Sequence, residues 1–156
     1  MNKEWNLDIL YSGFDDPKYS EDIKLLTKEI EALGALSNDI SSIEEAKLVS
    51  EYIAISENLN LLASKLGIFA NLKYSTNTTD SEAASALGRL MGLLSATAAP
   101  STKISQAIAQ ISDLDAIIAG NPTLAEYRYI LNNLQRDSKH LLSDKEEELF
   151  AKMNIS

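Results

Sequence analysis

An apolar stripe in the middle of the chain constrains the fold more than any other feature of the sequence. Its members recur at alternating steps of three and four residues: Tyr52, Ile55, Leu59, Leu62, Leu66 and Phe69. This spacing places all six side chains on one face of an α-helix. Polar residues fill most positions between them, which is typical of a half-buried helix. The pattern therefore predicts a helix over residues 52–75. If continuous, it is about 36 Å long, at roughly 1.5 Å per residue.

A second helical stretch follows the turn at residues 75–79 and predicts an antiparallel partner for the first. Thr79 and Glu82 have the spacing of a capping box, in which two side chains bind backbone N–H groups at the start of a helix. The apolar stripe of this stretch is Ala83, Leu87, Leu90, Met91 and Leu94. A row of small residues would let a neighbouring helix pack closely: Ala84, Gly88, Gly92 and Ala96. We infer close packing because each helical glycine costs up to about 1 kcal/mol relative to alanine.

Capping signals and a proline set the ends of these two helices. Ser42 and Glu45 form another capping box, so the first arm is expected to begin near Ile43. Pro100 lacks a backbone N–H and predicts a kink or break, after which helical spacing resumes. The chain is thus predicted to be organised around a long antiparallel helical hairpin over about residues 43–99.

Shorter helices are predicted before and after the hairpin. Asp16 and Pro17 are a favourable N-cap and first residue of a helix that loosens near Gly34 and precedes a loop at residues 37–41. An aromatic-rich lead, residues 5–14, is expected to fold back onto the domain.

After the hairpin, Asp113 is expected to cap a short helical turn over residues 114–119. Two further capping boxes each predict a helix: Thr123 with Glu126, and Ser143 with Glu146. The predicted fold class is all-α, a helical bundle built around the hairpin, with a break near Pro100 and shorter C-terminal helices.

Length, charge and residue usage exclude several classes of protein. The 156 residues are expected to form a single all-helical domain spanning residues 1–156. A net charge of −9 would repel phosphate backbones and disfavours nucleic acid as a partner. The chain has no cysteine, which excludes disulfides, thiolate metal sites and thiol nucleophiles. No run reaches the roughly 18 apolar residues of a membrane span, and no signal segment is visible, so we expect a cytoplasmic protein.

The sequence contains no pattern that predicts catalytic or metal-ligating residues. His140 is the only histidine, so an HExxH zinc helix cannot be present in residues 1–156. Clustered acidic residues, such as Glu146, Glu147 and Glu148, stand near helix starts, where the helix dipole favours negative charge. These carboxylates are better explained as capping groups than as metal ligands.

Three separate blocks of the sequence carry a family resemblance. The first block is residues 5–17, WNLDILYSGFDDP, and the second is residues 74–80, YSTNTTD. The third extends from residues 127–131, YRYIL, to residues 140–149, HLLSDKEEEL. In order and approximate spacing these blocks resemble the N-terminal region of oligoendopeptidase F, a branch of the thimet-oligopeptidase-like zinc metallopeptidases.

The resemblance implies a cytoplasmic, helical enzyme that cleaves short peptides. In this family a zinc ion is held by an HExxH helix and a downstream glutamate in a C-terminal catalytic domain, while the N-terminal helices form part of the wall of a substrate channel. Because residues 1–156 contain no such motif, no catalytic or metal residue is carried over. We therefore expect an N-terminal domain that is not catalytic by itself, holds no cofactor, and has a zinc-containing catalytic domain and short peptides as partners.

Lys73, Tyr74 and Arg89, near the polar edges of the hairpin, are the residues expected to contact that catalytic domain. Apolar surface left bare in the chain alone is expected to cause weak self-association. The alternative interpretation is a free-standing interaction module that binds a partner helix in a groove beside the hairpin. An HExxH motif in the downstream reading frame would favour the peptidase, and a stop codon after Ser156 would favour the module.

Overall fold

The computed structural model describes residues 10–153, with side chains described for residues 10–140. This part of the chain is all-α and contains no strand, which confirms the predicted fold class. The helices are α1 (Pro17–Asp39), α2 (Glu45–Thr76), α3 (Ser81–Ser95), α4 (Ala98–Ala109), α5 (Leu114–Gly120), α6 (Pro122–Ala125) and α7 (Arg128–Met153).

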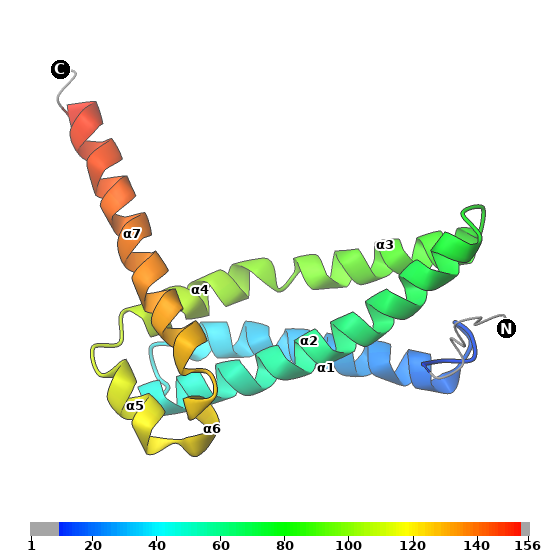
Figure 1. The fold of residues 1–156 in the computed structure, drawn as a ribbon, viewed down its shortest axis with the longest axis horizontal. Helices are drawn as coiled ribbons and strands as arrows, with labels where there is room; N and C mark the ends of the chain where they lie inside the picture. Colours follow the sequence, from blue (N-terminus) through cyan, green and yellow to red (C-terminus); the bar gives the residue numbers. More distant parts are fainter. Residues whose placement is uncertain (1–9, 154–156) are drawn as a thin grey trace, which may run out of the picture.

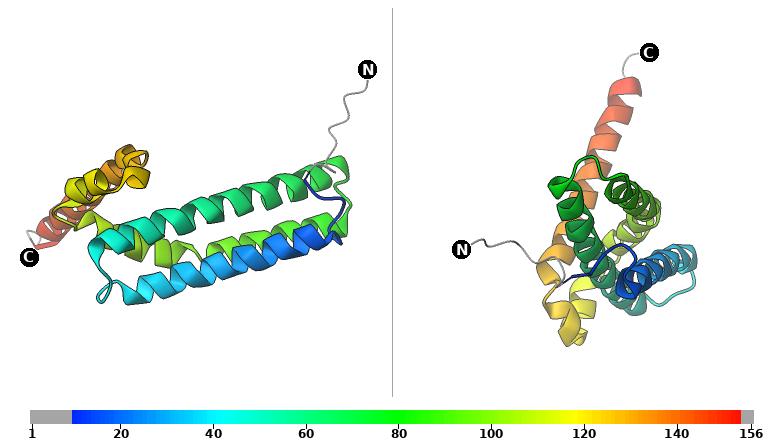
Figure 2. Two further views of the ribbon diagram at one scale, coloured as in Figure 1. Left: turned by 90° about the horizontal axis from the view of Figure 1, so that it is seen from below. Right: turned by 90° about the vertical axis from the view of Figure 1, so that its right-hand side faces the viewer.

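The helices α1 to α4 form an elongated bundle, and the C-terminal helices gather at one of its ends (Figure 1). α1 and α2 lie antiparallel in one layer, and α3 followed by α4 runs back along them in the other. An end-on view places α1, α2 and α3 at the corners of a triangle (Figure 2). α7 packs against α4 and then projects away from the bundle, on the side opposite the α1–α2 layer. Within the described residues, no helix combines the length and the hydrophobicity that a membrane crossing requires.

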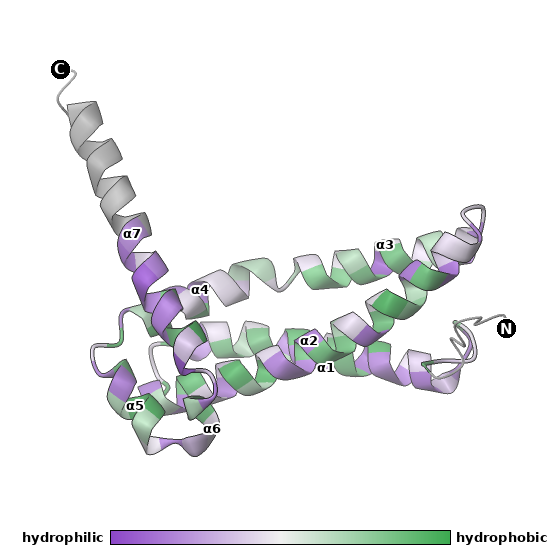
Figure 3. Ribbon diagram, viewed as in Figure 1, coloured by the Kyte–Doolittle hydropathy of each residue, from purple (hydrophilic) through white to green (hydrophobic). Residues whose placement is uncertain are grey.

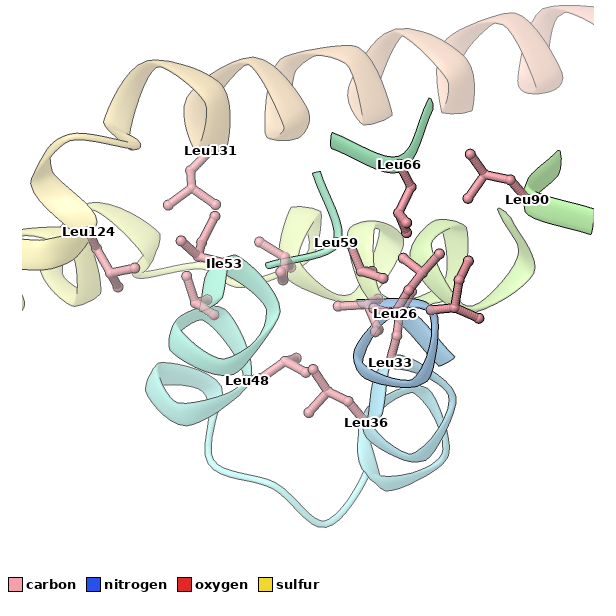
Figure 4. Close-up of a cluster of buried hydrophobic side chains, with 14 of the residues drawn as sticks. Leu26, Leu33, Leu36, Leu48, Ile53, Leu59, Leu66, Leu90, Leu124 and Leu131 are labelled. Carbon is pink, nitrogen blue, oxygen red and sulfur yellow. The ribbon is translucent and has the colours of Figure 1, made fainter. Parts of the chain in front are cut away.

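The hairpin predicted over residues 43–99 corresponds to α2 and α3. The stripe on α2 faces the core as predicted, with Leu59, Leu66 and Phe69 buried. These side chains meet Leu26 and Leu33 of α1 and Leu90 of α3 in one continuous cluster (Figure 4). Each leucine removed from water in this way contributes about 1.5–3 kcal/mol, so this cluster holds the three helices together.

The predicted helix starts at residues 42–45 and 79–82 are near the observed ones, but other residues make the caps. α3 begins after Asp80, whose carboxylate accepts hydrogen bonds from the backbone N–H groups of Glu82 and Ala83 at 2.9 and 3.1 Å. Thr79 instead donates its hydroxyl to the Asn77 side chain at 2.7 Å. The N-cap position of α2 is Glu44, which makes no side-chain capping bond. The Ser42 hydroxyl donates to the Asp39 carbonyl at 3.0 Å, so neither predicted capping box forms.

The break near Pro100 is present, although it lies before the proline. α3 ends at Ser95, and α4 begins at Ala98. Pro100 therefore occupies the first turn of α4, where the missing N–H group has no helical partner to lose. The proline begins a new helix and does not distort an existing one.

Two predicted interruptions of helices are wrong. α1 continues through Gly34 to Asp39, and the Ser37 hydroxyl, inside the helix, donates to the Gly34 carbonyl at 2.7 Å. α7 continues from Arg128 through Ser143 to Met153, so the predicted helix start at Ser143 lies inside a helix. Glycine and serine favour helix ends, but both residue types also occur inside helices. In both places the continuous backbone hydrogen bonds of the helix outweigh this preference.

The remaining C-terminal elements are close to the expectation. α5 follows Asp113 as predicted, although the Asp113 side chain makes no capping bond. The cap of α6 is Asn121, whose side-chain oxygen accepts from the Thr123 N–H at 3.0 Å, so the predicted box of Thr123 and Glu126 does not form. Asn121 is also held to α2 through its Nδ2, which donates to Ser50 Oγ at 3.3 Å.

The row of small residues on α3 does not pack against another helix in the described part of the chain. Ala84, Gly88, Gly92 and Ala96 are all exposed, and nothing lies within 4 Å of a Cβ built at either glycine. Met91, predicted to be in the core, is 67% exposed. Figure 3 shows that many residues along α3 are apolar. The expected close helix contact is therefore wrong for this surface.

Candidate functional site

An aromatic cluster lies at the end of the bundle where α1 begins and α2 ends. It contains Tyr11, Phe14, Tyr19 and Phe69, whose ring centroids are 5.1–5.9 Å apart, mostly in edge-to-face geometry. Tyr11 is 1% exposed and Phe69 is fully buried. Aromatic pairs of this kind add about 0.5–1.5 kcal/mol to the stabilisation from buried area. The described part of the aromatic-rich lead thus folds back onto the domain as predicted, while residues 5–9 lie outside the described residues.

A polar centre sits against this aromatic cluster. The Tyr11 hydroxyl donates to Asp22 Oδ2 at 2.5 Å, and the Lys65 ammonium donates to the same oxygen at 2.6 Å. Lys65 Nζ also lies 4.7 Å from the centroid of the Tyr11 ring, within the range of a cation–π contact. The three residues come from the lead, α1 and α2, so one carboxylate joins three segments of the chain.

The protonation states of this centre are fixed by its contacts. Burial raises the pKa of Asp22, but the hydrogen bonds from Lys65 and Tyr11 outweigh it and hold the pKa below its usual value of 3.8. Burial and the bond to Asp22 raise the pKa of the Tyr11 hydroxyl far above its usual value of 10.0. Asp22 is therefore a carboxylate and Tyr11 a neutral donor across the physiological range, which is a fixed anchoring arrangement.

The chain reaches this position through a tight turn at residues 12–16. Asp16 caps α1 by accepting from the Lys18 N–H at 2.9 Å, and its other oxygen accepts from the Ser12 N–H at 2.8 Å. These backbone hydrogen bonds lower the pKa of Asp16. Gly13 lies inside the turn, where an added Cβ would come within 2.6 Å of the Asp15 carboxylate. The predicted N-cap at Asp16 with Pro17 as the first helical residue is confirmed.

The structure places two of the three predicted contact residues beside the aromatic cluster. Lys73 Nζ lies 5.5 Å from the centroid of the Phe69 ring. Arg89, on α3, is close enough to Tyr19 to oppose the rise that burial causes in the pKa of that hydroxyl. Tyr74 is 37% exposed at the end of α2. Among the described residues neither Lys73 nor Arg89 forms an ion pair, so this end of an acidic chain carries two cations, of which Arg89 is exposed and Lys73 is half-buried.

The described residues do not fit a zinc site. Nowhere in this part of the chain do three His, Cys, Asp or Glu side chains come together in a group that could hold a metal ion. His140 lies exposed on α7. In the polar centre the donors and acceptors bind one another. This arrangement therefore holds the lead, α1 and α2 in a fixed orientation.

Sequence reasoning missed the polar centre of this site. Asp22 and Lys65 each lie beside an apolar stripe, and the spacing of the stripes gives neither residue a special role. A signal was present, because Asp22 falls among Tyr19, Ile23 and Leu26, which form the buried face of α1. A carboxylate that close to a buried stripe requires a partner. Which lysine supplies it depends on the packing of α1 against α2.

Comparison with known proteins gives one match. The family model described as Oligopeptidase F, an N-terminal peptidase family, matches residues 109–156. This segment starts at the last residue of α4 and includes α5, α6 and α7. No curated protein and no solved structure matches the chain significantly. The match confirms the resemblance to the N-terminal region of the oligopeptidase F family over residues 109–156, which contain the third block; the first two blocks lie outside the matched segment.

Proposed function

We propose that the chain is the N-terminal domain of a zinc-dependent oligoendopeptidase that hydrolyses short peptides in the cytoplasm. In this proposal the chain forms one all-helical domain, contributes part of the wall of the substrate channel and is not catalytic by itself. The observation that carries the proposal is the match of residues 109–156 to the oligopeptidase F family. Zinc and its ligands would belong to a C-terminal catalytic domain, because the described residues offer no set of ligands for a metal ion.

The way in which the matched segment is attached supports a scaffolding role. Leu131 of α7 is fully buried, and Gln135 donates its side-chain N–H to the Ile111 carbonyl at 2.7 Å. Leu124 of α6 and Ile118 of α5 are buried in the same core cluster as the hairpin. The segment that identifies the family is therefore packed into one core with α1 to α4, as expected of a rigid wall.

The two cations beside the aromatic cluster are the proposed contacts with the catalytic domain. Lys73 and Arg89 lie at one end of the bundle, and Tyr74 adds an exposed ring there. An acidic surface on the catalytic domain would pair with the two cations and orient the two domains. Such contacts change association and orientation more than raw affinity.

The test is peptide hydrolysis by the product of the complete reading frame and by the 156-residue chain alone. Internally quenched peptides of several lengths serve as substrates, with and without a zinc chelator. We expect zinc-dependent cleavage of short peptides by the complete protein and none by the chain alone. Zinc-dependent turnover by the 156-residue chain, or a complete protein with no peptidase activity, would contradict the proposal.

The contact residues are tested in the complete protein. Lys73→Glu together with Arg89→Glu should lower peptide cleavage or loosen the domains, as measured by limited proteolysis between them. The matched control is Lys24→Glu together with Lys28→Glu, which makes the same change in charge at exposed positions on α1. Equal effects of the two double variants would remove the specific role of Lys73 and Arg89.

A further inference from the structure

On the outer face of the bundle, opposite α3 and α4, the helices α1 and α2 lie side by side (Figure 2, left). On α1 the residues of this face follow helical steps of three and four: Asp22, Leu25, Glu29, Ala32 and Leu36. On α2 the facing residues are Glu51, Ile55, Asn58, Leu61, Lys65 and Ile68. Two bonds across the helices fix this pairing, Lys65 to Asp22 at 2.6 Å and Asn58 to Glu29 at 3.2 Å. We call this surface the α1–α2 groove.

The α1–α2 groove is hollowed at one end and carries exposed apolar side chains further along. Near the turn between the helices, a depression of about 480 Å³ is lined by residues that include Ala32, Leu36 and Ile55. Further along, Leu25, Leu61 and Ile68 are 48%, 70% and 52% exposed. Large exposed apolar side chains gathered on one face favour the binding of another chain.

Carboxylates border the α1–α2 groove. Its rim carries Glu29, Asp39, Glu44 and Glu51, and Glu57 lines a shallow depression on α2 together with Leu61. The two lysines closest to it already have acidic partners, Lys47 at 3.6 Å from Glu51 and Lys65 at 2.6 Å from Asp22. The groove therefore presents apolar side chains between acidic ones and fits a helix with an apolar and basic face.

The first half of α7 has the complementary character. Residues 128–140 contain three basic residues and one acidic residue, a net charge of +2 in a chain of net charge −9. Tyr129 is 76% exposed and Ile130 is 56% exposed. Tyr129, Arg136 and His140 share one face by helical spacing, and all three are exposed. α7 projects away from the bundle beyond this segment (Figure 1).

We propose that two copies of this chain associate by docking the exposed face of α7 of each copy into the α1–α2 groove of the other. Exchange in both directions closes the assembly as a dimer and provides two equal contacts. A single helix in a groove buries less area than a stable interface of roughly 1,200–2,000 Å² requires, and the second contact doubles it. The inference concerns self-association and holds whether or not the complete protein is a peptidase.

Sedimentation velocity over a range of concentrations tests the proposal on the full 156-residue chain. We expect a monomer at low micromolar concentration and a dimer at high concentration, with association weakened by added salt because charges contribute. A chain that stays monomeric at every concentration overturns the proposal. Particles that grow beyond a dimer overturn the reciprocal exchange.

Charge reversal on the groove separates specific docking from overall repulsion. Glu57→Lys reduces the net negative charge by two units, so a general electrostatic effect would strengthen association. The proposal expects the opposite, a dissociation constant raised about tenfold, because Glu57 borders the docking surface. Glu31→Lys on α1, exposed but outside the groove, makes the same change in charge and should not weaken the dimer. Equal effects of the two variants count against the proposal.

A matched pair of apolar variants tests the location of the contact. Leu61→Ser removes a 70% exposed leucine from the groove, whereas Met91→Ser removes a 67% exposed methionine from α3 in the other layer. Neither should alter the fold, because both side chains are largely in solvent. We expect Leu61→Ser to abolish dimerisation and Met91→Ser to leave it unchanged. Loss of the dimer in Met91→Ser alone would place the interface on α3.

Crosslinking identifies the partner segment directly, because the chain has no cysteine of its own. Leu61→Cys and Tyr129→Cys chains are mixed and treated with a thiol-reactive crosslinker. We expect a crosslinked heterodimer between them and far less between Met91→Cys and Tyr129→Cys. Absence of the Leu61–Tyr129 product in a sample that is dimeric by sedimentation overturns the assignment of α7 as the occupant.

Discussion

Tyr11 joins three parts of the chain through one side chain. Its ring packs edge-on against Tyr19 of α1 and Phe69 of α2, and its hydroxyl donates to Asp22. Lys65 covers the ring and binds the same carboxylate. The apolar contacts supply most of the stabilisation, and the hydroxyl selects the orientation of the ring, because a buried hydroxyl without a partner is costly.

Tyr11→Phe should therefore lower the free energy of unfolding by about 1.5–3 kcal/mol, the range for a hydrogen bond to a charged group. Tyr11→Ala should cost more, about 3–5 kcal/mol, because it also removes the buried ring. Urea unfolding at neutral pH measures both. Equal losses in the two variants would show that the ring contributes nothing beyond its hydroxyl.

Asp22 makes stability depend on acid pH. Because the pKa of Asp22 is lower in the folded protein than its usual value of 3.8, the carboxylate stabilises the fold fully above that value and less as pH falls through the folded pKa. Asp22→Asn should be less stable than the parent chain near neutral pH, and the difference should shrink below about pH 4. Urea unfolding at a series of pH values measures the difference, and a constant difference would refute the assigned role.

At the scale of the elements, a single residue caps the start of each of three helices, although a nearby residue of a suitable type could have done so. Asp80, Asp16 and Asn121 each accept from backbone N–H groups at a helix start. Threonine and serine at nearby positions carry the same sequence signal and make other bonds. The choice depends on the backbone geometry of each turn, which the spacing of residue types does not contain.

Asp80→Ala is expected to destabilise the protein by about 1 kcal/mol, because it leaves two N–H groups of α3 without an acceptor. Thr79→Ala, which would be the damaging change if Thr79 were the cap, should cost less. Thermal unfolding followed by circular dichroism distinguishes the two. A larger loss for Thr79→Ala would restore the capping box predicted from the sequence.

Gly88→Ala should stabilise the chain by about 0.5–1 kcal/mol, because the glycine is in a helix and an added Cβ meets nothing within 4 Å. Gly92→Ala should behave in the same way. The same substitutions in the complete protein would be unfavourable if another domain packs closely on α3. Chemical denaturation of the chain alone gives the sign, and destabilisation there would mean that the surface is covered within the chain.

At the scale of the whole molecule, the C-terminal helices pack against one end of the bundle formed by α1 to α4, and few side chains make this contact. α7 packs mainly on α4, with Leu131 fully buried and Gln135 bonded to Ile111. The remainder of the fold is held by the cluster between α1, α2, α3 and α4. The attachment of α7 is therefore the part of the fold most sensitive to one substitution.

Leu131→Ala should destabilise the protein by about 2–5 kcal/mol through loss of a fully buried side chain. Ile130→Ala, one residue earlier and 56% exposed, is the matched control and should cost less than about 0.5 kcal/mol. Hydrogen exchange should show faster exchange in α7 of Leu131→Ala than in α2. Uniform acceleration across all helices would indicate that α7 unfolds only with the whole chain.

The sequence by itself determined the helical class, the hairpin of α2 and α3, the start of α1 at Pro17 and the family resemblance. These features follow from apolar spacing, from proline and from ordered sequence blocks, all of which are local. Only the tertiary structure decided that α7 continues through Ser143, that Met91 and the small residues of α3 stay exposed, and that Tyr11, Asp22 and Lys65 meet. The physical reason is that burial and hydrogen-bond partners depend on which faces of distant helices pack together, and spacing within one helix leaves that choice open.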